Sequence, residues 1–478
     1  MIRRIIYFGI AIVCLSIVFT GCAPTVVQKT ENTATPVGYD HTNAQDTTNT
    51  ATITWRDYFT DPHLIALIDT ALNNNQELNI TLQEIQVARN EVRARKGEYL
   101  PFVNIMAGAE VEKSGRYTSQ GSSEANTEIE PGRETPDPLP NYTVAAVATW
   151  EVDIWNKLRN AKKSAVNRYL STVEGKNFMV TNLIAEIATA YYELLALDNQ
   201  LEIVQQNIAI QSDALDVVRQ QKEAARVTEL AVRRFEAQVL NTNALQYGIR
   251  QNITQTENWI NFLVGRYPQP IQRNAEGFTD LVPKTIYAGI PAQLLENRPD
   301  VRQAEFNLAA AKLDVQVAKA RFYPSLGISA GIGLQAFDPT YLIKTPQSLV
   351  YSLAGDLVAP LVNRNAIKAA YYTANSMQIQ AVYNYERTLL NAYVEVANQL
   401  SMIGNMEQSY NLKSQEVVAL TESITISNRL FRSARADYME VLLTQRDALE
   451  SKFELIETKK QQMNAVVNIY QALGGGWK

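Results

Sequence analysis

The sequence is poor in the residues that build metal centres and disulfide frameworks, with two cysteines and two histidines among 478 residues. So few potential ligands nearly exclude a metal cluster or a disulfide scaffold. His41 lies in a polar stretch and His63 in an Asp-Pro-His turn, and we interpret both as solvated surface positions. No glycine-rich phosphate loop follows a predicted strand, and no Ser-His-Asp set can be assembled around these histidines. The sequence therefore predicts neither an enzyme nor a resident cofactor or metal.

Long hydrophobic runs are also missing after the first 20 residues. No later stretch approaches the roughly 18 consecutive apolar residues that a membrane-spanning helix needs. The chain is 46% hydrophobic and 19% charged, which is ordinary for folded protein and excludes both general disorder and a polytopic helical membrane protein. The formal net charge of -5 gives no basis for binding nucleic acid.

The N-terminus has the pattern of a secretory signal. Two arginines precede an apolar run over residues 5–19, and Gly21-Cys22 follows shortly after it. A basic start, an apolar stretch of this length and small residues at its end are typical of a cleaved signal peptide. The predicted signal is residues 1–21, and because Cys14 lies inside it, Cys22 is the cysteine left after cleavage.

The end of this signal resembles a bacterial lipobox, which predicts a covalent lipid on Cys22. Two or three acyl chains on one cysteine anchor a protein stably, whereas a single chain does not. An ordinary signal peptide with a chance cysteine is the alternative. Ala23, rather than an acidic retention residue, follows Cys22, so we expect delivery to the outer membrane. Residues 22–54 are rich in Thr, Asn and Gln and are expected to form a lipidated flexible tether.

An internal repeat organises the rest of the chain. Residues 78–105 align with residues 301–328, and Pro101 then lies opposite Pro324. Each half has the predicted order of a helix, a pair of strands, a very long helix, a turn and a long helix. Several shared patterns in the same order indicate a duplication. The two predicted halves are residues 55–285 and 286–478.

Four long helices are predicted from the spacing of apolar residues. From Leu183 to Val218, apolar residues recur at alternating steps of four and three, and only Gln211 breaks the run. Apolar residues every 3.5 positions define a coiled-coil seam, and a helix over 155–222 is roughly 100 Å long. A simple coiled-coil scaffold would explain these helices equally well. The predicted spans are 155–222, 228–265, 363–432 and 437–472.

Four segments alternate between apolar and small or polar side chains. In one of them, Ile328 and Ala330 face one way, whereas Gly327 and Ser329 face the other. Such alternation over about 10 residues, with aromatic residues near the ends, is typical of transmembrane β-strands. A half-exposed sheet of a soluble protein is the alternative. The predicted strands are residues 102–113, 141–154, 324–337 and 347–358.

A sheet in lipid must close on itself, because lipid offers no hydrogen bonds to an open edge. Four strands cannot close a barrel, since about eight are the practical minimum. We therefore expect several chains to share one barrel, with eight strands in a dimer or twelve in a trimer. The predicted fold class is an α+β membrane protein, in which a shared transmembrane β-barrel is continued by a long α-helical coiled-coil barrel and the chain has an internal twofold repeat.

Four motifs carry a family resemblance. They are WRDYFTDPHLIALIDTALNNNQEL (55–78), GIPAQLLENRPDVRQAE (289–305), FYPSLGIS (322–329) and ALGGGW (472–477). They resemble the NodT-type outer-membrane lipoproteins, TolC-like outer-membrane factors of efflux systems driven by resistance-nodulation-division (RND) pumps. The similarity covers residues 55–478, and the motif around Arg298-Pro299-Asp300 is quite specific.

The resemblance implies a homotrimer with a twelve-stranded barrel in the outer membrane of a Gram-negative bacterium and a twelve-helix tunnel extending into the periplasm. A belt near residues 266–290 would surround the tunnel, and the loops at 113–141 and 337–347 would face the cell exterior. The implied partners are a periplasmic adaptor (membrane fusion) protein, an inner-membrane RND transporter and outer-membrane lipid. The implied function is a passive exit duct for small molecules and drugs.

The sequence is compatible with other functions. The exit duct of a type I protein secretion system and a metal-ion efflux duct are alternatives with the same architecture, and a structural adhesin or envelope scaffold is a third. The lipobox and the Arg298-Pro299-Asp300 motif favour small-molecule efflux. Neighbouring genes would discriminate between an RND pump with its adaptor and an ABC transporter with a secreted substrate.

The two helical hairpin tips are predicted to form the gate and the end that docks the adaptor. Thr228 and Asp437 occupy matching places just before the last helix of each half. Arg226 and Arg435 are candidates to bridge neighbouring hairpins, and the sequence around Tyr438 resembles the family's tip. Three copies of Asp437 around a narrow axis would repel one another and attract cations.

The second tip departs from the family pattern. Ala434 stands where the family has glycine, and the family's gate aspartate falls at Ala436, one place before Asp437. The exact gate residue is therefore open. Asp437 also stands three residues before Glu440, which predicts a capping box worth about 1 kcal/mol to the helix. Capping alone is the alternative to capping combined with a charged constriction.

Overall fold

The computed structural model describes residues 23–39, 47–283, 285–433 and 435–477. The predicted signal peptide and the lipidation site Cys22 lie outside the described residues. The chain divides into two compact units, and each combines segments from both predicted halves. Unit 1 contains the described residues up to Thr30, with Val87–Tyr169 and Phe306–Val382, and unit 2 contains Glu31–Gln86, Leu170–Glu305 and the described residues from Tyr383 onward.

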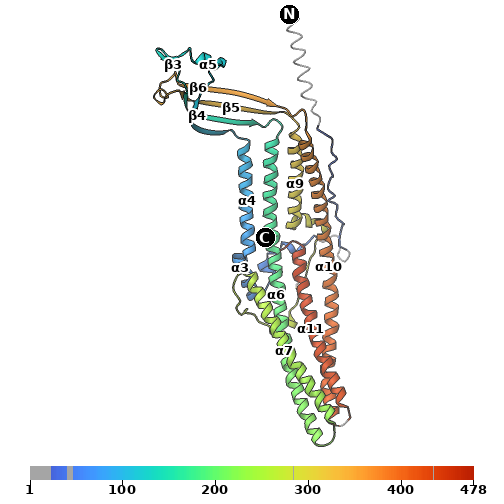
Figure 1. Cartoon of the computed structure of the whole chain (residues 1–478). Helices are drawn as coiled ribbons and strands as arrows, with labels where there is room; N and C mark the ends of the chain where they lie inside the picture. The colour runs from blue at the N-terminus through green and yellow to red at the C-terminus, as the bar shows by residue number, and fades with distance from the viewer. Residues whose placement is uncertain (1–22, 40–46, 284, 434, 478) are drawn as a thin grey trace. The chain divides into compact units, whose positions relative to one another are not determined.

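Unit 1 contains a four-stranded antiparallel sheet in the order β1-β4-β5-β6 (Figure 1). The observed strands begin and end within two residues of the predicted spans. They are β1 (Phe102–Glu112), β4 (Leu139–Val152), β5 (Ser325–Ala336) and β6 (Leu349–Val358).

The strand register places the predicted apolar sets on one face of the sheet. Residues directly opposite one another on antiparallel strands point to the same face. One such row crosses all four strands through Ile105, Ala146, Ile332 and Tyr351. Because side chains alternate along each strand, every second row is apolar in the same way. This part of the prediction is confirmed.

The loops at one end of the sheet contain short elements that the sequence did not predict. Between β1 and β4 lie α5 (Ser119–Glu124), β2 (Glu128–Glu130) and β3 (Arg133–Glu134), and a 3-10 turn at Pro339–Tyr341 joins β5 to β6. The Tyr341 hydroxyl donates to Glu130 Oε2 at 2.6 Å, which raises the pKa of Tyr341. The Arg133 guanidinium lies 4.8 Å from the centroid of the Phe337 ring. These contacts hold the two loops together.

Unit 2 is built around two helical hairpins, α6 with α7 and α10 with α11 (Figure 1). Each of the four long helices begins and ends within two residues of its predicted span. None of the helices in the described residues has a stretch that is both long and apolar enough to cross a bilayer. Together with α5, the α-helices of the described residues are α2 (Trp55–Tyr58), α3 (Pro62–Asn74), α4 (Gln76–Glu98), α6 (Lys157–Glu223), α7 (Glu229–Leu263), α8 (Leu294–Asn297), α9 (Pro299–Ala320), α10 (Asn365–Arg432) and α11 (Tyr438–Ala472).

The main core of unit 2 joins α3 to the hairpins. Leu64 and Ile68 of α3 are fully buried with Ile187 and Leu194 of α6 and Ile260 of α7. Asp61 starts α3 by accepting a hydrogen bond from the amide of His63 at 2.8 Å, and Pro62 follows at the first helical position, where its missing N–H costs nothing.

The predicted seam of α6 is buried. Val204 and Val218 are completely inaccessible, and so is Gln211, the residue that interrupts the apolar spacing. The seam therefore continues through Gln211 with a polar side chain inside it.

The described residues before α2, 23–39 and 47–54, pack against other elements of the chain, whereas the composition predicted a flexible tether. In unit 1, Ala23 and Val26 pack against the cluster of Phe322 and Tyr371. The amide of Lys29 donates to Gln378 Oε1 at 3.3 Å, and Gln378 Nε2 donates to Lys29 O at 2.7 Å.

The same segment continues into unit 2 with further contacts. Tyr39 is buried and stacks on Tyr393 with ring centroids 5.3 Å apart. Asn49 Nδ2 donates to Gln293 Oε1 at 3.1 Å, and the amide of Thr50 donates to Tyr287 O at 2.9 Å. The polar residues that indicated flexibility therefore serve as hydrogen-bonding groups for a packed segment.

The Arg298-Pro299-Asp300 motif ties the start of α9 to the end of α11 in unit 2. Arg298 is 4% exposed and its guanidinium donates to Asp300 Oδ1 and Oδ2 at 2.9 and 2.7 Å. It also donates to Glu395 Oε2 at 2.6 Å and to Ala472 O at 2.9 Å. These partners hold the pKa of Arg298 above its ordinary value although burial opposes the charged form. The motif therefore has a structural role.

Candidate functional site

The apolar face of the sheet is exposed. Ile105 is 84% exposed, Tyr351 82% and Leu353 79%. Contiguous exposed apolar surface marks a contact with protein or membrane. Among the described residues, β1 and β6 each pair with a single strand, so each has one edge without a partner in this chain. An unpartnered strand edge is a template for pairing with another chain.

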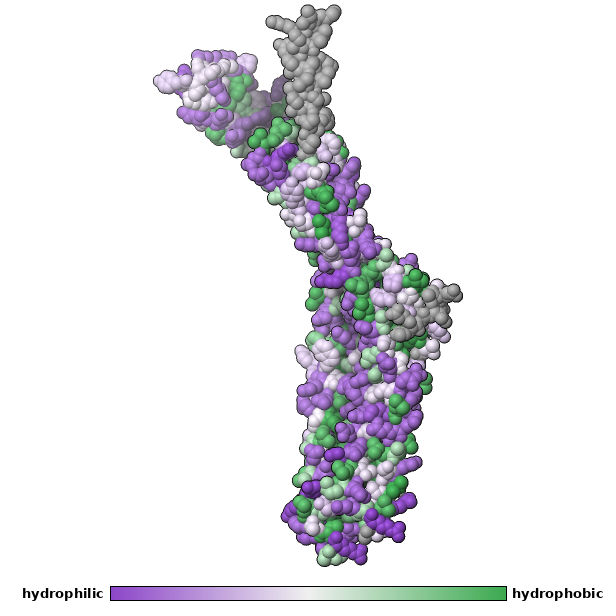
Figure 2. Space-filling model, turned by 90° about the vertical axis from the view of Figure 1, so that its right-hand side faces the viewer, coloured by the Kyte–Doolittle hydropathy of each residue, from purple (hydrophilic) through white to green (hydrophobic). Residues whose placement is uncertain are grey.

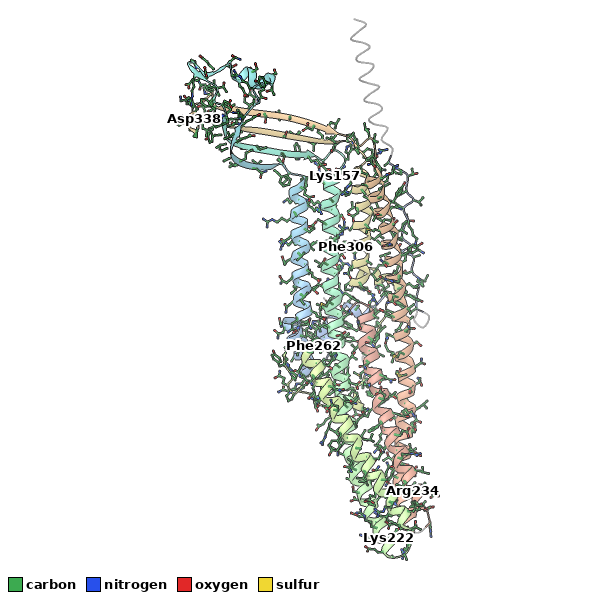
Figure 3. All side chains as sticks on the ribbon, in the orientation of Figure 1. Lys157, Lys222, Arg234, Phe262, Phe306 and Asp338 are labelled. Carbon is green, nitrogen blue, oxygen red and sulfur yellow. The ribbon has the colours of Figure 1, made fainter. Side chains whose placement is uncertain are left out.

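Aromatic residues gather at the end of the sheet where α6 begins. Trp150 Nε1 donates to Tyr99 O at 3.0 Å, and Trp155 Nε1 donates to Pro324 O at 2.7 Å. Trp155 also stacks on Tyr323, with ring centroids 4.8 Å apart. Such amphipathic rings suit a boundary between an apolar and a wet environment. Figure 3 places Lys157 at this end of unit 1 and Asp338 in the loops at the other end.

The opposite face of the sheet carries small and polar residues. One row consists of Asn104, Val147, Gly331 and Ser352. On the same face, a Cβ added to Gly333 would lie 2.6 Å from the Cα of its neighbour on β4, so only glycine fits there. The sheet is therefore apolar on one side and small or polar on the other, as a wall between lipid and water would be.

A cavity of about 600 Å³ lies at the α6 end of the sheet. Its lining includes the carboxylates of Glu98, Glu151 and Asp356 and the side chain of Leu158. Glu151 forms an ion pair with Lys157. Trp150 and Ile328 of the apolar face also line it, so the cavity does not belong to one face alone.

The structure places the predicted tip residues as matching pairs. Thr228 is the N-cap of α7 and Asp437 is the N-cap of α11. The amide of Arg226 donates to Gln221 O at 2.8 Å, and the amide of Arg435 donates to Leu430 O at 2.8 Å. Both bonds span five residues and close the preceding helix in the same way.

The predicted capping box at Asp437 is wrong. The side chain of Asp437 makes no capping hydrogen bond, and neither does that of Thr228. The amide of Glu440 donates instead to the main-chain carbonyl of Asp437 at 3.1 Å, and the amide of Ala231 donates to that of Thr228 at 3.1 Å. The backbone thus satisfies the amide that a capping side chain would bind. The carboxylate of Asp437 is left exposed.

Neither Arg226 nor Arg435 forms an ion pair within the described part of the chain, and both are exposed. Tyr438 is half-buried and packs against the apolar cluster at the tips. That cluster includes Phe235 of α7 and Phe431 of α10, so it joins the ends of the two hairpins. The predicted bridging by the arginines is therefore not made inside one chain.

The tips also contain an ion-pair network that the sequence did not single out. Lys222 Nζ lies 2.6 Å from Glu229 Oε2, and Arg233 lies 2.9 Å from both Glu229 and Glu236. The hydrogen bond from Lys222 is the main cause of the lowered pKa of Glu229. Arg234 Nη1 contacts Met439 Sδ at 2.9 Å, and Figure 3 shows Lys222 and Arg234 at this end of unit 2. Opposite charges spaced three or four residues apart on a helix are the signal that would have found this network.

The belt segment after α7 is anchored by buried polar contacts. The guanidinium of Arg273 lies 2.5 Å from Asp198 Oδ2 and 2.5 Å from Glu257 Oε1. Further along, Lys459 of α11 donates to Leu281 O, and its ammonium lies 4.5 Å from the centroid of the Tyr410 ring. Burial is the main cause of the lowered pKa of Lys459. The segment is thus fastened to both hairpins of unit 2.

The long helices of unit 2 also expose large apolar side chains. Leu240 and Tyr247 of α7 are 64% and 66% exposed, and Leu390 and Leu412 of α10 are 65% and 68% exposed. Figure 2 shows hydrophobic patches interspersed with hydrophilic surface along these hairpins. Both the sheet and the hairpins therefore present apolar surface that the chain itself does not cover.

A family model described as outer membrane efflux protein matches residues 67–266 and 290–475. The chain is 27% identical over 424 residues to the solvent efflux pump outer membrane protein SrpC of Pseudomonas putida, which covers 88% of this chain and 87% of that protein. It is 23% identical over 470 residues to the cation efflux system protein CusC of Escherichia coli, which covers 97% and 98%. A crystal structure of a membrane protein from Pseudomonas aeruginosa has a TM-score of 0.83 and 23% identity, and the match covers 95% of this chain and 99% of that chain.

Proposed function

The chain belongs to the outer membrane efflux protein family, and we propose that it is the outer-membrane exit duct of a tripartite efflux system driven by an RND pump. As a member of this family it is an outer-membrane efflux protein of a Gram-negative bacterium. The observation that carries the proposal is the sheet, whose one face is apolar and exposed while the other is small and polar.

The sheet supports a shared transmembrane barrel. Because four strands in an antiparallel meander give edges that run in opposite directions, β6 of one chain can pair with β1 of the next without breaking the pattern. Such head-to-tail contacts either close into a ring or continue as a filament, and a barrel requires the closed ring. Three chains of four strands give twelve, which clears the minimum of about eight. The small and polar faces then line the lumen.

The hairpins support a helical tunnel. The four long helices and their exposed apolar residues suit packing against neighbouring chains, and three chains supply twelve helices. The matching order of elements in the two halves is consistent with the internal twofold repeat. The tips are then the end that meets a periplasmic adaptor, which in turn links the duct to the inner-membrane pump.

The transported cargo is a small molecule in this proposal. The names of the relatives refer to solvent and to cations, so membership of the family does not select one cargo. A metal-ion efflux duct is the second candidate, and the relationship to the cation efflux protein favours it over protein secretion.

Purified protein added to planar lipid bilayers tests the duct directly. We expect stable unitary conductance from an oligomer, together with restored drug or solvent tolerance in a strain that lacks its own duct and carries the matching pump and adaptor. A chain that inserts into bilayers without conducting would overturn the exit-duct function. Tolerance restored only to metal ions would select the second candidate.

The exposed Asp437 carboxylate leads to a prediction about the gate. Asp437→Asn is expected to weaken the cation selectivity of the closed channel and to raise its conductance, because it removes three like charges near one axis. Arg435→Ala is expected to raise conductance if the arginine bridges neighbouring chains. Single-channel recordings measure both. Glu407→Gln removes an exposed charge from the middle of α10 and serves as the matched control. Unchanged conductance and selectivity in stable trimers would move the gate elsewhere.

The lipid anchor on Cys22 stays a prediction. Cys22→Ala is expected to abolish incorporation of labelled fatty acid and to impair outer-membrane assembly, because the acyl chains are attached to that thiol. Metabolic labelling followed by fractionation measures both effects. Cys14→Ser changes the other cysteine and should leave labelling intact, since this residue is removed with the signal. Label entering the Cys22→Ala protein would show that the lipobox assignment is wrong.

A further inference from the structure

A second cavity lies in unit 1, and the duct function makes no use of it. It has a volume of about 450 Å³ and is formed by the residue that follows α4, the start of α6 and one residue of α9. This size falls within the roughly 300–1,000 Å³ that is usual for small-molecule sites. We call it the basic cavity. It combines three basic side chains with an apolar floor, namely Arg159, Lys162 and Lys163 with Tyr99, Val166 and Leu313.

The positive charges of the basic cavity are available to a ligand. No carboxylate pairs with Arg159, Lys162 or Lys163 among the residues that the structure describes. The neighbouring bases are paired elsewhere, since Lys157 contacts Glu151 and Arg168 contacts Asp314. Lys162 Nζ lies 5.6 Å from the centroid of the Tyr99 ring, which orients it over the apolar floor.

The amides at the start of α6 are already occupied. Asp153 Oδ1 and Oδ2 accept hydrogen bonds from the amides of Leu158 and Arg159 at 3.0 and 2.9 Å. A helix N-terminus with free amides would attract any small anion. Here an anion would instead be bound by the three long side chains, which reach outward from an apolar surface.

A hydrogen bond links the basic cavity to the apolar face of the sheet. Trp150, which stands on the apolar face opposite Ile328, donates to Tyr99 O, and the Tyr99 side chain lines the basic cavity. The cavity thus adjoins the apolar face beside the aromatic residues at its end.

The depth of the basic cavity matches a headgroup layer. β4 ends at Val152, and Lys163 is the seventh residue of α6, which begins at Lys157. At 1.5 Å per residue, Arg159 and Lys163 lie roughly 3 and 9 Å along the helix from Lys157. The headgroup region adds about 5–8 Å beyond the hydrocarbon on each side of a bilayer. Long basic side chains reach toward phosphates from such positions.

We propose that the basic cavity binds the headgroup of an anionic phospholipid in the leaflet that borders the α6 end of the sheet. The phosphate is held by Arg159, Lys162 and Lys163, and the first part of the lipid's apolar chains lies against Tyr99 and Leu313. This inference rests on the proposed function, because it requires the apolar face to be in lipid. It assigns the site to one partner, a membrane lipid with net negative charge.

Native mass spectrometry of the full-length oligomer tests this site. The oligomer is released from nanodiscs containing equal amounts of phosphatidylglycerol and phosphatidylcholine. The number of molecules of each lipid that stay bound to it is then measured. A Lys or Arg near an anionic lipid surface favours binding roughly fivefold. Arg159→Gln with Lys162→Gln and Lys163→Gln is therefore expected to lower the preference for phosphatidylglycerol at least tenfold. Arg159→Lys with Lys162→Arg and Lys163→Arg keeps the charge and is expected to retain the preference.

A control removes the same charge elsewhere. Arg89→Gln with Arg250→Gln and Lys452→Gln changes three basic residues outside the basic cavity and should keep the lipid preference. Equal loss in this control, or no loss in the cavity variant, would overturn the proposal. Displacement of the lipid by inorganic phosphate would also overturn it, because the site would then bind free anions. Failure of the duct function would appear differently, as protein that does not enter the bilayer.

Discussion

Replacing Leu353 with arginine is expected to destabilise the membrane-inserted sheet by roughly 2–4 kcal/mol, the cost of a charge near the bilayer midplane. Leu353 lies opposite Ala330 near the middle of β5, and it is 79% exposed on the apolar face. Ile328 lies opposite Trp150 near the end of the same strand. Ile328→Arg should therefore cost less, because the penalty falls toward about 0–1 kcal/mol at the interface. The temperature at which the oligomer dissociates and the yield in the membrane fraction measure both effects.

The control for this series stands next to Ile328 in the chain. Ser329 pairs with Thr149 and Ala354 on the small and polar face, so Ser329→Arg would place its charge in a watery lumen. It should be tolerated. Equal loss of the oligomer in all three variants would contradict the assignment of the faces, and a larger loss for Ile328→Arg than for Leu353→Arg would contradict the depth order.

The sheet could be predicted because its signal is local. Side chains alternate between the two faces along a strand, so the sequence shows which residues share a face. The apolar residues of neighbouring strands then have to lie side by side, as they do in the row through Ile105 and Tyr351. The long helices were predictable for the same reason, since a 3.5-residue seam acts within one segment. Gln211 shows the limit of that argument, because a polar residue in the seam is buried all the same.

The contacts that the sequence did not predict join distant segments. The two loops at the end of the sheet meet through Tyr341 and Glu130, which are 211 residues apart and share no periodic pattern. The segment before α2 has few large apolar residues, so its composition indicated flexibility. Its described part is held instead by paired hydrogen bonds, such as the two between Lys29 and Gln378, which lie 349 residues apart.

The candidate site was only partly predictable. The tips could be located because the repeat aligns Thr228 with Asp437, and both stand at helix starts as expected. The capping-box prediction was wrong because spacing only identifies a residue that can cap a helix. Whether its side chain bonds to the amide of Glu440 depends on whether a main-chain carbonyl has already accepted from that amide. The basic cavity is invisible to local patterns, since Tyr99, Lys162 and Leu313 come from three segments that are far apart in the sequence.

Arg298→Met is expected to cost about 3 kcal/mol of stability, which is the loss found when one partner of a buried ion pair is removed. The substitution leaves the carboxylate of Asp300, whose side chain is 15% exposed, without its bidentate partner. It also removes the hydrogen bond to Ala472 O that ties α11 to the start of α9. Thermal dissociation of the purified oligomer measures the loss. Arg56→Met removes an arginine from the ion pair with Asp69, and because Arg56 is 58% exposed the cost should stay below about 1 kcal/mol.

A second substitution separates charge from packing at this motif. If the loss in Arg298→Met comes mainly from the uncompensated carboxylate, Arg298→Met combined with Asp300→Leu should recover part of the stability, because an apolar pair replaces a buried ion pair at little cost. If the hydrogen bond to Ala472 O dominates instead, the double variant should be no more stable than the single one, since neither new side chain can donate to that carbonyl. An Arg298→Met protein as stable as the Arg56→Met control would show that the motif does not hold α9 and α11 together.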